Sequence, residues 1–312
     1  MNLRPFGIAV LGTGIMGRRM LAALQQHPRF DVVALYDPHP ESLAAALAQH
    51  PHVRVASGID DLVDDPTVDV VYIASPPALH LDGVRAALAA GRACLCEKPL
   101  AADFAQAMAL RDLVAKAALP FAVNFPFASA APSRRLVELV RDGSLGPIDD
   151  ATIRLRFARW PRAWQAGASA WLDGAAEGGF TREVLSHFVF LAQRVFGEAT
   201  VADVHLTRVP GRAETALRAN LVHAAATVRI DAAVAGDVAD DNRFEIVGRD
   251  ATAALVNWSQ LDYRGHVSER VDATPRTLDG LAAMLEGRGD HGLATVDEAV
   301  AVVRCVEGML AG

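Results

Sequence analysis

The sequence has few cysteines, no long apolar run and no excess of basic residues, and each shortage argues against a class of protein. Only three cysteines occur among the 312 residues, and they lack the spacing of a metal site. Cys94 and Cys96 are separated by a single residue within one apolar segment, so they do not have the CxxC spacing of a redox pair. We expect these two and Cys305 to be buried small hydrophobes, as in a protein of the reducing cytoplasm.

Hydropathy and charge argue against a membrane or a nucleic acid as partner. No apolar run approaches the roughly 20 residues of a membrane-spanning helix, and the N-terminus leads directly into a predicted strand without a visible signal peptide. The formal net charge is −7 and the pI is about 5.8, which disfavours binding to phosphate backbones. One basic run is typical of an exposed strand edge with solvated head groups. It consists of Arg154, Arg156, Arg159 and Arg162.

The composition suits a packed core, and the length suits two domains. Hydrophobic residues make up 52% and charged residues 21% of the chain. Residues 1–123 alternate short apolar runs with helical segments, which predicts a doubly wound parallel sheet covered by helices on both faces. The predicted strands are Phe6–Leu11, Val32–Tyr36, Val53–Ala56, Val68–Ala74, Ala93–Cys96 and Pro120–Val123.

The pattern changes in residues 124–312, which we assign to an α+β domain with an open, mainly antiparallel sheet. Alternation of polar and apolar residues is typical of half-exposed strands. The strand-like runs are Ala151–Trp160, Val201–Val209, Ala216–Asp231 and Arg243–Val256. The predicted helices are Ser133–Arg141, Thr181–Phe196 and Val296–Leu310. The terminal helix, residues 296–310, could pack back on the first domain.

A glycine-rich loop between the first strand and the first helix predicts a dinucleotide site in a Rossmann domain. The loop residues are Gly12, Thr13, Gly14, Ile15, Met16 and Gly17. Gly12 permits the tight turn, Gly14 lets the pyrophosphate approach, and Gly17 lets the helix lie close on the strand. Asp37 ends the second strand, where an acid accepts hydrogen bonds from a ribose 2′-hydroxyl and repels a 2′-phosphate. With no Arg or Lys at positions 38–42, we expect NAD as cofactor, with NADP as the alternative. Asp37 could instead form a turn before Pro38.

Two later segments extend this predicted cofactor site. Ser75, Pro76 and Pro77 end the fourth strand in a rigid turn, and His80 follows, either bonded to a loop carbonyl or in contact with the substrate. Glu97 and Lys98 end the fifth strand, at the sheet edge where ligands of open α/β sheets collect. Lys98 is therefore expected at the nicotinamide end of the cofactor, unless it only forms a salt bridge with Glu97.

Together these segments resemble the Gfo/Idh/MocA oxidoreductase family, named for glucose–fructose oxidoreductase, inositol dehydrogenase and a rhizopine catabolism protein. The matching elements are GTGIMG at 12–17, SPPALH at 75–80, CEKPL at 96–100 and GGFTREVLSH at 178–187. The resemblance implies a Rossmann domain followed by an open-faced sheet domain. It also implies a lysine, here Lys98, that binds and polarises the reacting oxygen, and an acid and a histidine four positions apart, here Glu183 and His187.

The chemistry of these residue types fits the oxidation of a carbinol or its reverse. Positions i and i+4 share one helix face, so Glu183 and His187 can point the same way. A histidine suits proton exchange with the substrate oxygen in either direction, and Lys98 would stabilise an alkoxide. Glu183 would orient His187 or hold a substrate hydroxyl. The alternative is a surface Glu–His pair without a catalytic role.

The sequence departs from the family pattern where the substrate is expected. Glu183 replaces the shorter Asp, and Phe180 and Leu185 stand where small glycines are frequent, which predicts a narrower and more apolar pocket. The predicted substrate residues are Asn124, Phe125, Trp160, Trp164 and Trp171. Sugars stack on aromatic faces, although these tryptophans would also suit a sheet cover or an oligomer interface.

The sequence therefore favours an NAD(P)-dependent oxidoreductase acting on a sugar, polyol or related hydroxy or keto compound. A catalytically inactive NAD(P)-binding regulator and an NAD-using lyase or hydrolase of the same family remain as alternatives. We expect a homodimer or homotetramer formed through the open sheet face, and no metal. An alternating run predicts this face to be apolar. Its residues are Val222, Ala224, Ala226, Val228 and Ile230.

Overall fold

The computed structural model describes residues 4–236 and 239–312, which form two compact units. The first unit combines the chain up to Phe125 with Thr274–Val300, and the second combines Pro126–Ala273 with Ala301–Gly312. The change of unit at Phe125 lies close to the boundary expected from the sequence. The predicted split into 1–123 and 124–312 differs from this division because residues 274–300 group with the first unit.

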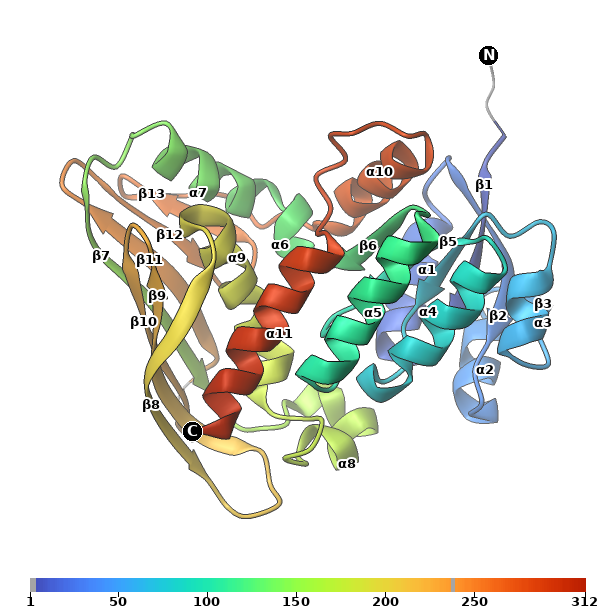
Figure 1. Cartoon of the computed structure of the whole chain (residues 1–312), viewed down its shortest axis with the longest axis horizontal. Coiled ribbons are helices and arrows are strands. Elements are labelled where there is room, and N and C mark those ends of the chain that lie inside the picture. Colours follow the sequence, from blue (N-terminus) through green and yellow to red (C-terminus); the bar gives the residue numbers. More distant parts are fainter. Residues whose placement is uncertain (1–3, 237–238) are drawn as a thin grey trace. The chain divides into compact units, whose positions relative to one another are not determined.

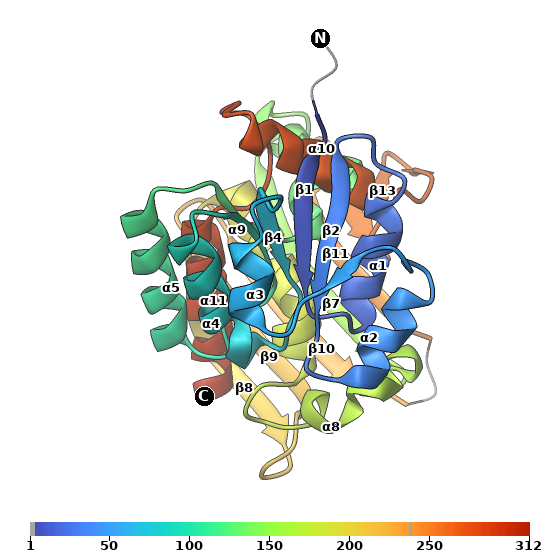
Figure 2. The same ribbon diagram turned by 90° about the vertical axis from the view of Figure 1, so that its right-hand side faces the viewer.

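The first unit is built on a parallel six-stranded sheet with the order β3-β2-β1-β4-β5-β6. Its strands are β1 (Phe6–Leu11), β2 (Phe30–Tyr36), β3 (Arg54–Val55), β4 (Val70–Ile73), β5 (Ala93–Glu97) and β6 (Phe121–Asn124). Its helices before β6 are α1 (Ile15–Leu24), α2 (Pro40–Leu47), α3 (Ile59–Asp64), α4 (His80–Ala89) and α5 (Phe104–Ala117). Helices α1 and α2 lie on one side of β1, β2 and β4, and α3, α4 and α5 lie on the other (Figure 2). This is the predicted doubly wound sheet.

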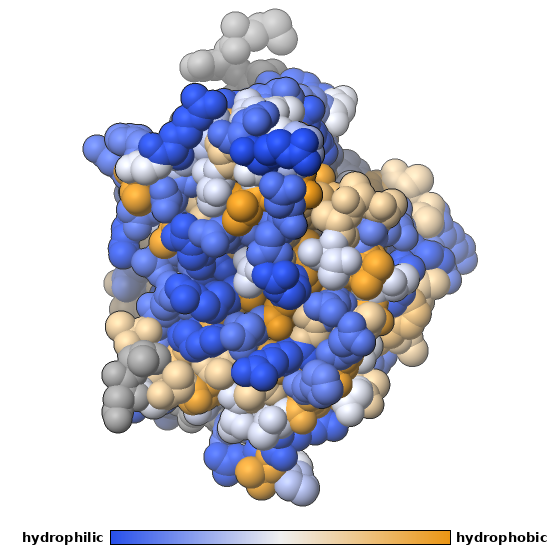
Figure 3. All heavy atoms as spheres, turned by 90° about the vertical axis from the view of Figure 1, so that its left-hand side faces the viewer, coloured by the Kyte–Doolittle hydropathy of each residue, from blue (hydrophilic) through white to orange (hydrophobic). Residues whose placement is uncertain are grey.

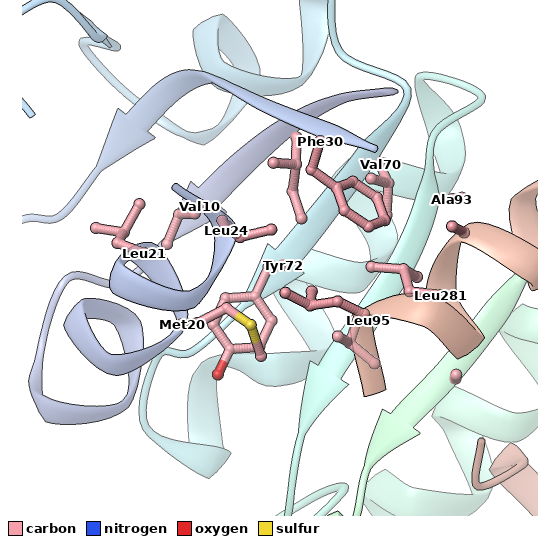
Figure 4. Close-up of a cluster of buried hydrophobic side chains, with 14 of the residues drawn as sticks. Val10, Met20, Leu21, Leu24, Phe30, Val70, Tyr72, Ala93, Leu95 and Leu281 are labelled. Carbon is pink, nitrogen blue, oxygen red and sulfur yellow. The ribbon is translucent and has the colours of Figure 1, made fainter. Parts of the chain in front are cut away.

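The core of this unit includes a helix that the strand–helix alternation does not reveal. Helix α10 (Thr274–Leu285) contributes Leu278 and Leu281 to a cluster of buried side chains with Val10, Tyr72 and Leu95 from the sheet (Figure 4). Burying a leucine side chain stabilises a fold by about 1.5–3 kcal/mol. The apolar stripe of α10 therefore explains why a segment so late in the chain belongs to the first unit.

The second unit is built on an eight-stranded sheet with the order β14-β13-β12-β11-β7-β10-β9-β8, antiparallel except for the β7–β10 pair. Its strands are β7 (Ile148–Phe157), β8 (Ala199–Arg208), β9 (Glu214–His223), β10 (Thr227–Val234), β11 (Asp241–Gly248), β12 (Thr252–Val256), β13 (Gln260–Tyr263) and β14 (His266–Val267). Its helical segments are α6 (Pro126–Ser129), α7 (Ala131–Arg141), η2 (Ala163–Ala168), α8 (Ser169–Leu172), η3 (Thr181–Leu185), α9 (Ser186–Phe196) and the later turns of α11 (Val296–Ala311). Within the described residues, no helix is long and apolar enough to cross a bilayer.

Two of the predicted strands are wrong because each contains a turn. The run Ala216–Asp231 reverses after His223, whose backbone N–H donates to the carbonyl of Ala226 at 2.9 Å. Three consecutive alanines form this turn, so the sequence carries no glycine or proline signal there. The run Arg243–Val256 likewise turns after Gly248, whose N–H donates to Ala251 at 3.0 Å.

The open face of this sheet is charged, which corrects the prediction of an apolar face. Alternate side chains are buried on the face along which α7 and α9 lie (Figure 1). Val228 and Ile230 are on that buried face, because the turn after His223 pairs Val228 with Leu221 and not with Val222. The other face carries ion pairs, and hydrophilic side chains run down its middle (Figure 3). These pairs are Arg154–Asp241, Arg156–Asp231, Arg229–Asp150 and Arg243–Glu245.

The three cysteines are free and buried. Burial raises the pKa of Cys94 and Cys96 well above the usual thiol range, and it raises the pKa of Cys305 to about 11. All three are therefore protonated thiols at neutral pH, which confirms the interpretation that they pack as small hydrophobes.

Candidate functional site

The loop between β1 and α1 has three glycines, and the fold requires only two of them. Gly12 has a φ of +96°, and a Cβ there would overlap the backbone of Ala74 and Ser75. A Cβ on Gly17 would overlap the carbonyl oxygen of Gly12. Gly14 has an ordinary φ of −62°, and a Cβ there would meet no atom of the described chain within 4 Å. The small size of Gly14 therefore serves something other than packing, as expected where a ligand approaches the backbone.

Asp37 is held against this loop at the end of β2. Its Oδ2 atom accepts hydrogen bonds from the backbone N–H of Thr13 at 2.7 Å and from the Thr13 hydroxyl at 3.1 Å. Its Oδ1 atom accepts the backbone N–H of His39 at 2.8 Å, which is the turn that the alternative interpretation of Asp37 expects. Arg18, which no motif in the sequence marks, donates from Nη1 to the carbonyl of Thr13 at 2.9 Å. The carboxylate thus fixes the loop, and its remaining lone pairs can accept ribose hydroxyls.

The 75–80 segment is tied to the loop that follows Lys98 by the buried His80. Its Nε2 atom lies 2.9 Å from the carbonyl oxygen of Ser75, and its Nδ1 atom lies 3.2 Å from the carbonyl oxygen of Leu100. Burial lowers the pKa of His80 below its usual value, although both carbonyls oppose this shift. The neutral imidazole carries a single N–H, so it donates to one of these two carbonyls and its ring lies against both segments, the turn formed by Ser75, Pro76 and Pro77 and the segment behind Lys98.

A buried polar cluster lies at the carboxyl ends of β4, β5 and β6. The Glu97 carboxylate accepts hydrogen bonds from the Tyr72 hydroxyl at 2.5 Å, the Asn124 amide at 2.7 Å and the backbone N–H of Lys98 at 3.2 Å. Burial raises the pKa of Glu97, and the bonds from Tyr72 and Asn124, together with the charge of Lys98, oppose the shift. Asn124 and Phe125 are predicted to contact substrate, but both are buried, with exposed fractions of 6% and 2%. The Asn124 amide holds the Glu97 carboxylate instead. Tyr72 is a site residue that the apolar pattern of its strand conceals.

Glu183 and His187 lie at the junction of a π-helical turn and α9, where the sequence predicts one continuous helix. Glu183 belongs to η3 and is half-buried, and His187 lies in the first turn of α9 and is 6% exposed. The neighbouring Arg182 anchors the turn, with a bidentate ion pair to Glu307 at 2.7 and 2.8 Å. π-Helical turns occur frequently at functional sites, because they redirect side chains within a helix.

The backbone before this turn is fixed by close contacts at two glycines. A Cβ on Gly178 would overlap the carbonyl oxygens of Trp171 and Leu172, and a Cβ on Gly179, where φ is +98°, would overlap the Glu214 carboxylate. That carboxylate, which is buried, accepts the backbone N–H of Thr181 at 2.6 Å. The Gly178–Gly179 pair thus lets a carboxylate from β9 cap the start of the helix.

Several aromatic residues of the second unit lie near His187 or Arg162. The His187 ring lies 5.6 Å from the Phe127 ring and 5.1 Å from the Trp258 ring, measured between centroids. Trp160 packs on Phe157 and Phe180, and its indole N–H donates to the Leu172 carbonyl at 3.0 Å. Trp164 is 47% exposed, and the Arg162 guanidinium lies 4.8 Å from its ring centroid. Trp171 is half-buried, and its carbonyl accepts the N–H of Gly174. Trp258 and Arg162 were not predicted as site residues.

The first unit fits a dinucleotide better than a metal ion. Gly14 leaves room beside the loop, and the N-terminus of α1 has no side-chain cap, so its backbone N–H groups and helix dipole can bind phosphate. Among the residues described, 4–236 and 239–312, no group of three His, Cys, Asp or Glu side chains is placed to hold a metal.

Comparison with known families identifies both parts of the chain. Residues 6–125 match the GFO_IDH_MocA model described as "Oxidoreductase family, NAD-binding Rossmann fold". Residues 133–254 match the model described as "GFO/IDH/MocA C-terminal domain". The two matches are adjacent in the order that the sequence predicts, and together they cover most of the chain.

Individual relatives are distant, and most share only part of their length with this chain. A dTDP-3,4-didehydro-2,6-dideoxy-alpha-D-glucose 3-reductase of Streptomyces violaceoruber is 34% identical over 47% of this chain and 43% of its own length. A levoglucosan dehydrogenase of Pseudarthrobacter phenanthrenivorans is 25% identical over 81% of this chain and 66% of its own length. The chain spans only about a third of the length of the curated relatives that match first, at 31% and 36%. The crystal structure of GenD2 from gentamicin A biosynthesis, in complex with NAD, has the same fold, with a TM-score of 0.81, 22% identity and coverage of 100% of this chain and 95% of that chain.

Proposed function

Because the chain belongs to the Gfo/Idh/MocA oxidoreductase family, we propose that it transfers hydride between a nicotinamide cofactor and a sugar, polyol or related hydroxy or keto compound. One observation carries this proposal. Gly14 is small without a packing reason, at the loop where the family has its NAD-binding fold. The relatives named for sugar reduction and dehydrogenation support the substrate class.

The first unit would hold the cofactor. The residues proposed to line this site are Gly12, Thr13, Gly14, Ile15, Met16, Gly17, Asp37, Ser75, Pro76, Pro77, His80, Glu97 and Lys98. The loop amides would bind the pyrophosphate and the Asp37 carboxylate a ribose hydroxyl, which favours NAD over NADP. The bound cofactor supplies the hydride chemistry, and the protein supplies placement and electrostatics.

Three side chains carry the proposed catalytic roles. The Lys98 ammonium stabilises negative charge on the reacting oxygen. The His187 imidazole takes the hydroxyl proton during oxidation and returns it during reduction. The Glu183 carboxylate orients His187 or binds a substrate hydroxyl. These assignments rest on the family resemblance and on the placement of each residue within its own unit.

The buried cluster around Glu97 supports the role given to Lys98. Glu97 lies directly before Lys98 and accepts the Lys98 backbone N–H, while Tyr72 and Asn124 hold the carboxylate in place. A side chain whose backbone is fixed in this way loses less entropy when it binds a developing charge. The cluster therefore orients Lys98 before substrate arrives.

Cofactor binding is tested by thermal unfolding with NADH and NADPH in separate samples. A ligand at about 100 times its Kd stabilises the folded state by roughly 2.7 kcal/mol, which shifts the midpoint by several degrees. We expect the larger shift with NADH. A shift with NADPH alone would contradict the role of Asp37, and no shift with either would contradict the proposed function, provided that mass spectrometry shows no copurified cofactor.

We further propose that the protein acts as a homo-oligomer in the cytoplasm. The open face of the eight-stranded sheet carries both charge signs in neighbouring pairs, so a second copy related by a two-fold axis can present a complementary pattern. The buried free thiols suit a reducing compartment. Sedimentation at low and high salt tests the assembly, because a charged interface dissociates as salt rises.

A further inference from the structure

Three tryptophans surround one arginine in the second unit, and we call this set the tryptophan frame: Trp160, Trp164 and Trp258 around Arg162. The centre of the Arg162 guanidinium lies 5.7, 4.8 and 5.9 Å from the three ring centroids. Its Nε atom donates to the Gln165 side-chain oxygen at 3.1 Å. Cation–π contacts and a hydrogen bond to a side-chain amide thus fix the direction in which the guanidinium points.

Trp258 occupies a backbone position that suits glycine or asparagine. It follows Asn257 in the turn between β12 and β13, where Trp258 has a φ of +73° and Asn257 a φ of +46°. A bulky residue in the left-handed region costs roughly 1–2 kcal/mol. Such strain is frequent at ligand-binding positions, where the surrounding structure holds the residue in place.

The ring of the strained residue contacts both the arginine and the proposed catalytic histidine. The Trp258 centroid lies 5.1 Å from the His187 ring with the two planes at 81°, and 5.9 Å from the Arg162 guanidinium. Phe127 and Phe188 pack on the same ring at 5.7 and 5.6 Å. Trp258 itself is only half-buried, so an apolar, partly accessible surface adjoins both a cation and a general base.

We propose that Arg162 and Trp258 form a substrate subsite beside His187 that binds a polyhydroxylated ring bearing an anionic group, either a carboxylate or a phosphate. The inference rests on the proposed function and names its substrate class. The electron-rich indole face attracts the C–H groups of a sugar ring. The planar guanidinium donates two parallel hydrogen bonds to a carboxylate or a phosphate. Trp160 and Trp164 keep the guanidinium in place, which reduces the entropy lost on binding.

The direct test is a binding titration followed by tryptophan fluorescence, with NAD present in saturating amount. The probes are glucose, galactose and mannose, each compared with its uronate and its 6-phosphate. We expect at least one charged form to bind about ten-fold or more tightly than its neutral sugar, in keeping with a charge-assisted bidentate contact. Comparing the uronate with the 6-phosphate decides which anion the subsite takes.

Two variants and their matched controls assign the effect to named residues. Arg162→Gln should remove the preference for the charged form and leave the neutral sugar unaffected, and Arg162→Lys should restore only part of it. Arg159→Gln removes an equal charge from an exposed position in the same segment and should change nothing. Trp258→Asn should lower the affinity for charged and neutral sugars alike. Its unfolding midpoint should stay within a few degrees of the parent protein, because the relief of backbone strain at position 258 offsets the lost packing of the indole ring. Asn257→Gly, in the same turn, should bind as the parent does.

Each outcome bears on the inference. It is overturned if no charged sugar binds more tightly than its neutral partner, if Arg162→Gln weakens both forms equally, or if Arg159→Gln has the same effect. Failure of the proposed function is recognised separately, by the absence of an NADH-induced thermal shift. Charged sugars that bind through Arg162 without being oxidised would uphold the subsite and refute the activity.

Discussion

Replacing Gly14 with alanine separates cofactor binding from folding. The φ of Gly14 is one that any residue can adopt, and the added Cβ meets no atom of the described chain within 4 Å. We therefore expect the free energy of unfolding to change by less than about 1 kcal/mol, the range found for compatible Gly→Ala changes. In the proposed cofactor site the same methyl group would stand where the pyrophosphate approaches the loop amides. Loss of one charge-assisted hydrogen bond costs about 1.5–3 kcal/mol, so NADH should bind roughly 10- to 150-fold more weakly.

Two further glycines provide the comparisons. Gly289 is exposed and lies three residues after Glu286, whose ion pair with Arg29 is at the amino edge of the sheet, opposite the loop. A Cβ added to Gly289 would likewise meet no atom of the described chain within 4 Å. Gly289→Ala should therefore leave both unfolding and NADH binding unchanged. Gly17→Ala should destabilise the fold by about 1–3 kcal/mol, because its methyl group overlaps the Gly12 carbonyl.

The assays are urea denaturation for stability and isothermal titration calorimetry with NADH for affinity. The reasoning is refuted if Gly14→Ala binds NADH within about two-fold of the parent protein. It is also refuted if the variant loses more than about 2 kcal/mol of stability, because the space around Gly14 would then belong to the fold and not to a ligand.

The remaining predictions concern Lys98, the ion pair of Arg182 and the buried histidines. Lys98→Met should lower kcat by about 100-fold or more and weaken NADH binding far less, because the ammonium stabilises charge on the reacting oxygen. Lys116→Met, at an exposed position on α5, should leave both kcat and NADH affinity unchanged. Normal turnover in Lys98→Met would contradict the role of Lys98. Arg182→Met should lower the free energy of unfolding in urea by roughly 3–5 kcal/mol, because Glu307 then lacks its ion-pair partner. A loss below about 1 kcal/mol would show that this ion pair does not anchor the turn. Burial lowers the pKa of His223, as it does that of His80, so near neutral pH the unfolded state binds more protons than the folded state. The free energy of unfolding should therefore fall as the pH drops from about 7 through 6.5, the pKa of an unperturbed histidine. His223→Gln should make the dependence of this free energy on pH shallower.

The candidate site was predictable from the sequence where its residues lie in short motifs at the ends of strands. Gly12, Gly14 and Gly17 stand in a fixed spacing, and the structure shows the contacts that require two of them. Lys98 directly follows an apolar strand, so its place at the edge of the sheet could be inferred. Tyr72 could not be predicted, because a tyrosine in an apolar run gives no sign of the buried carboxylate that it contacts.

The sequence does not reveal contacts between residues that are far apart along the chain. Trp258 lies in a hairpin turn without a glycine, and neither its positive φ nor its contact with His187 follows from local pattern. The basic run in the sequence predicts solvated head groups, which is correct for Arg154 and Arg156 on the open face but wrong for Arg162, which tryptophans surround. The apolar face was mispredicted for the same reason, since a turn of three alanines reverses which side chains share a face.

The sequence by itself determined the parallel and mainly antiparallel sheets, the glycine loop and the family, because these depend on periodicity and on spacing along a continuous segment. Only the tertiary structure decided that α10 completes the core of the first unit, that the open face of the second sheet is charged, and that Trp258 contacts both Arg162 and His187. The physical reason is that side-chain contacts depend on the register and direction of distant segments. A change of one residue in a turn moves every later side chain to the opposite face.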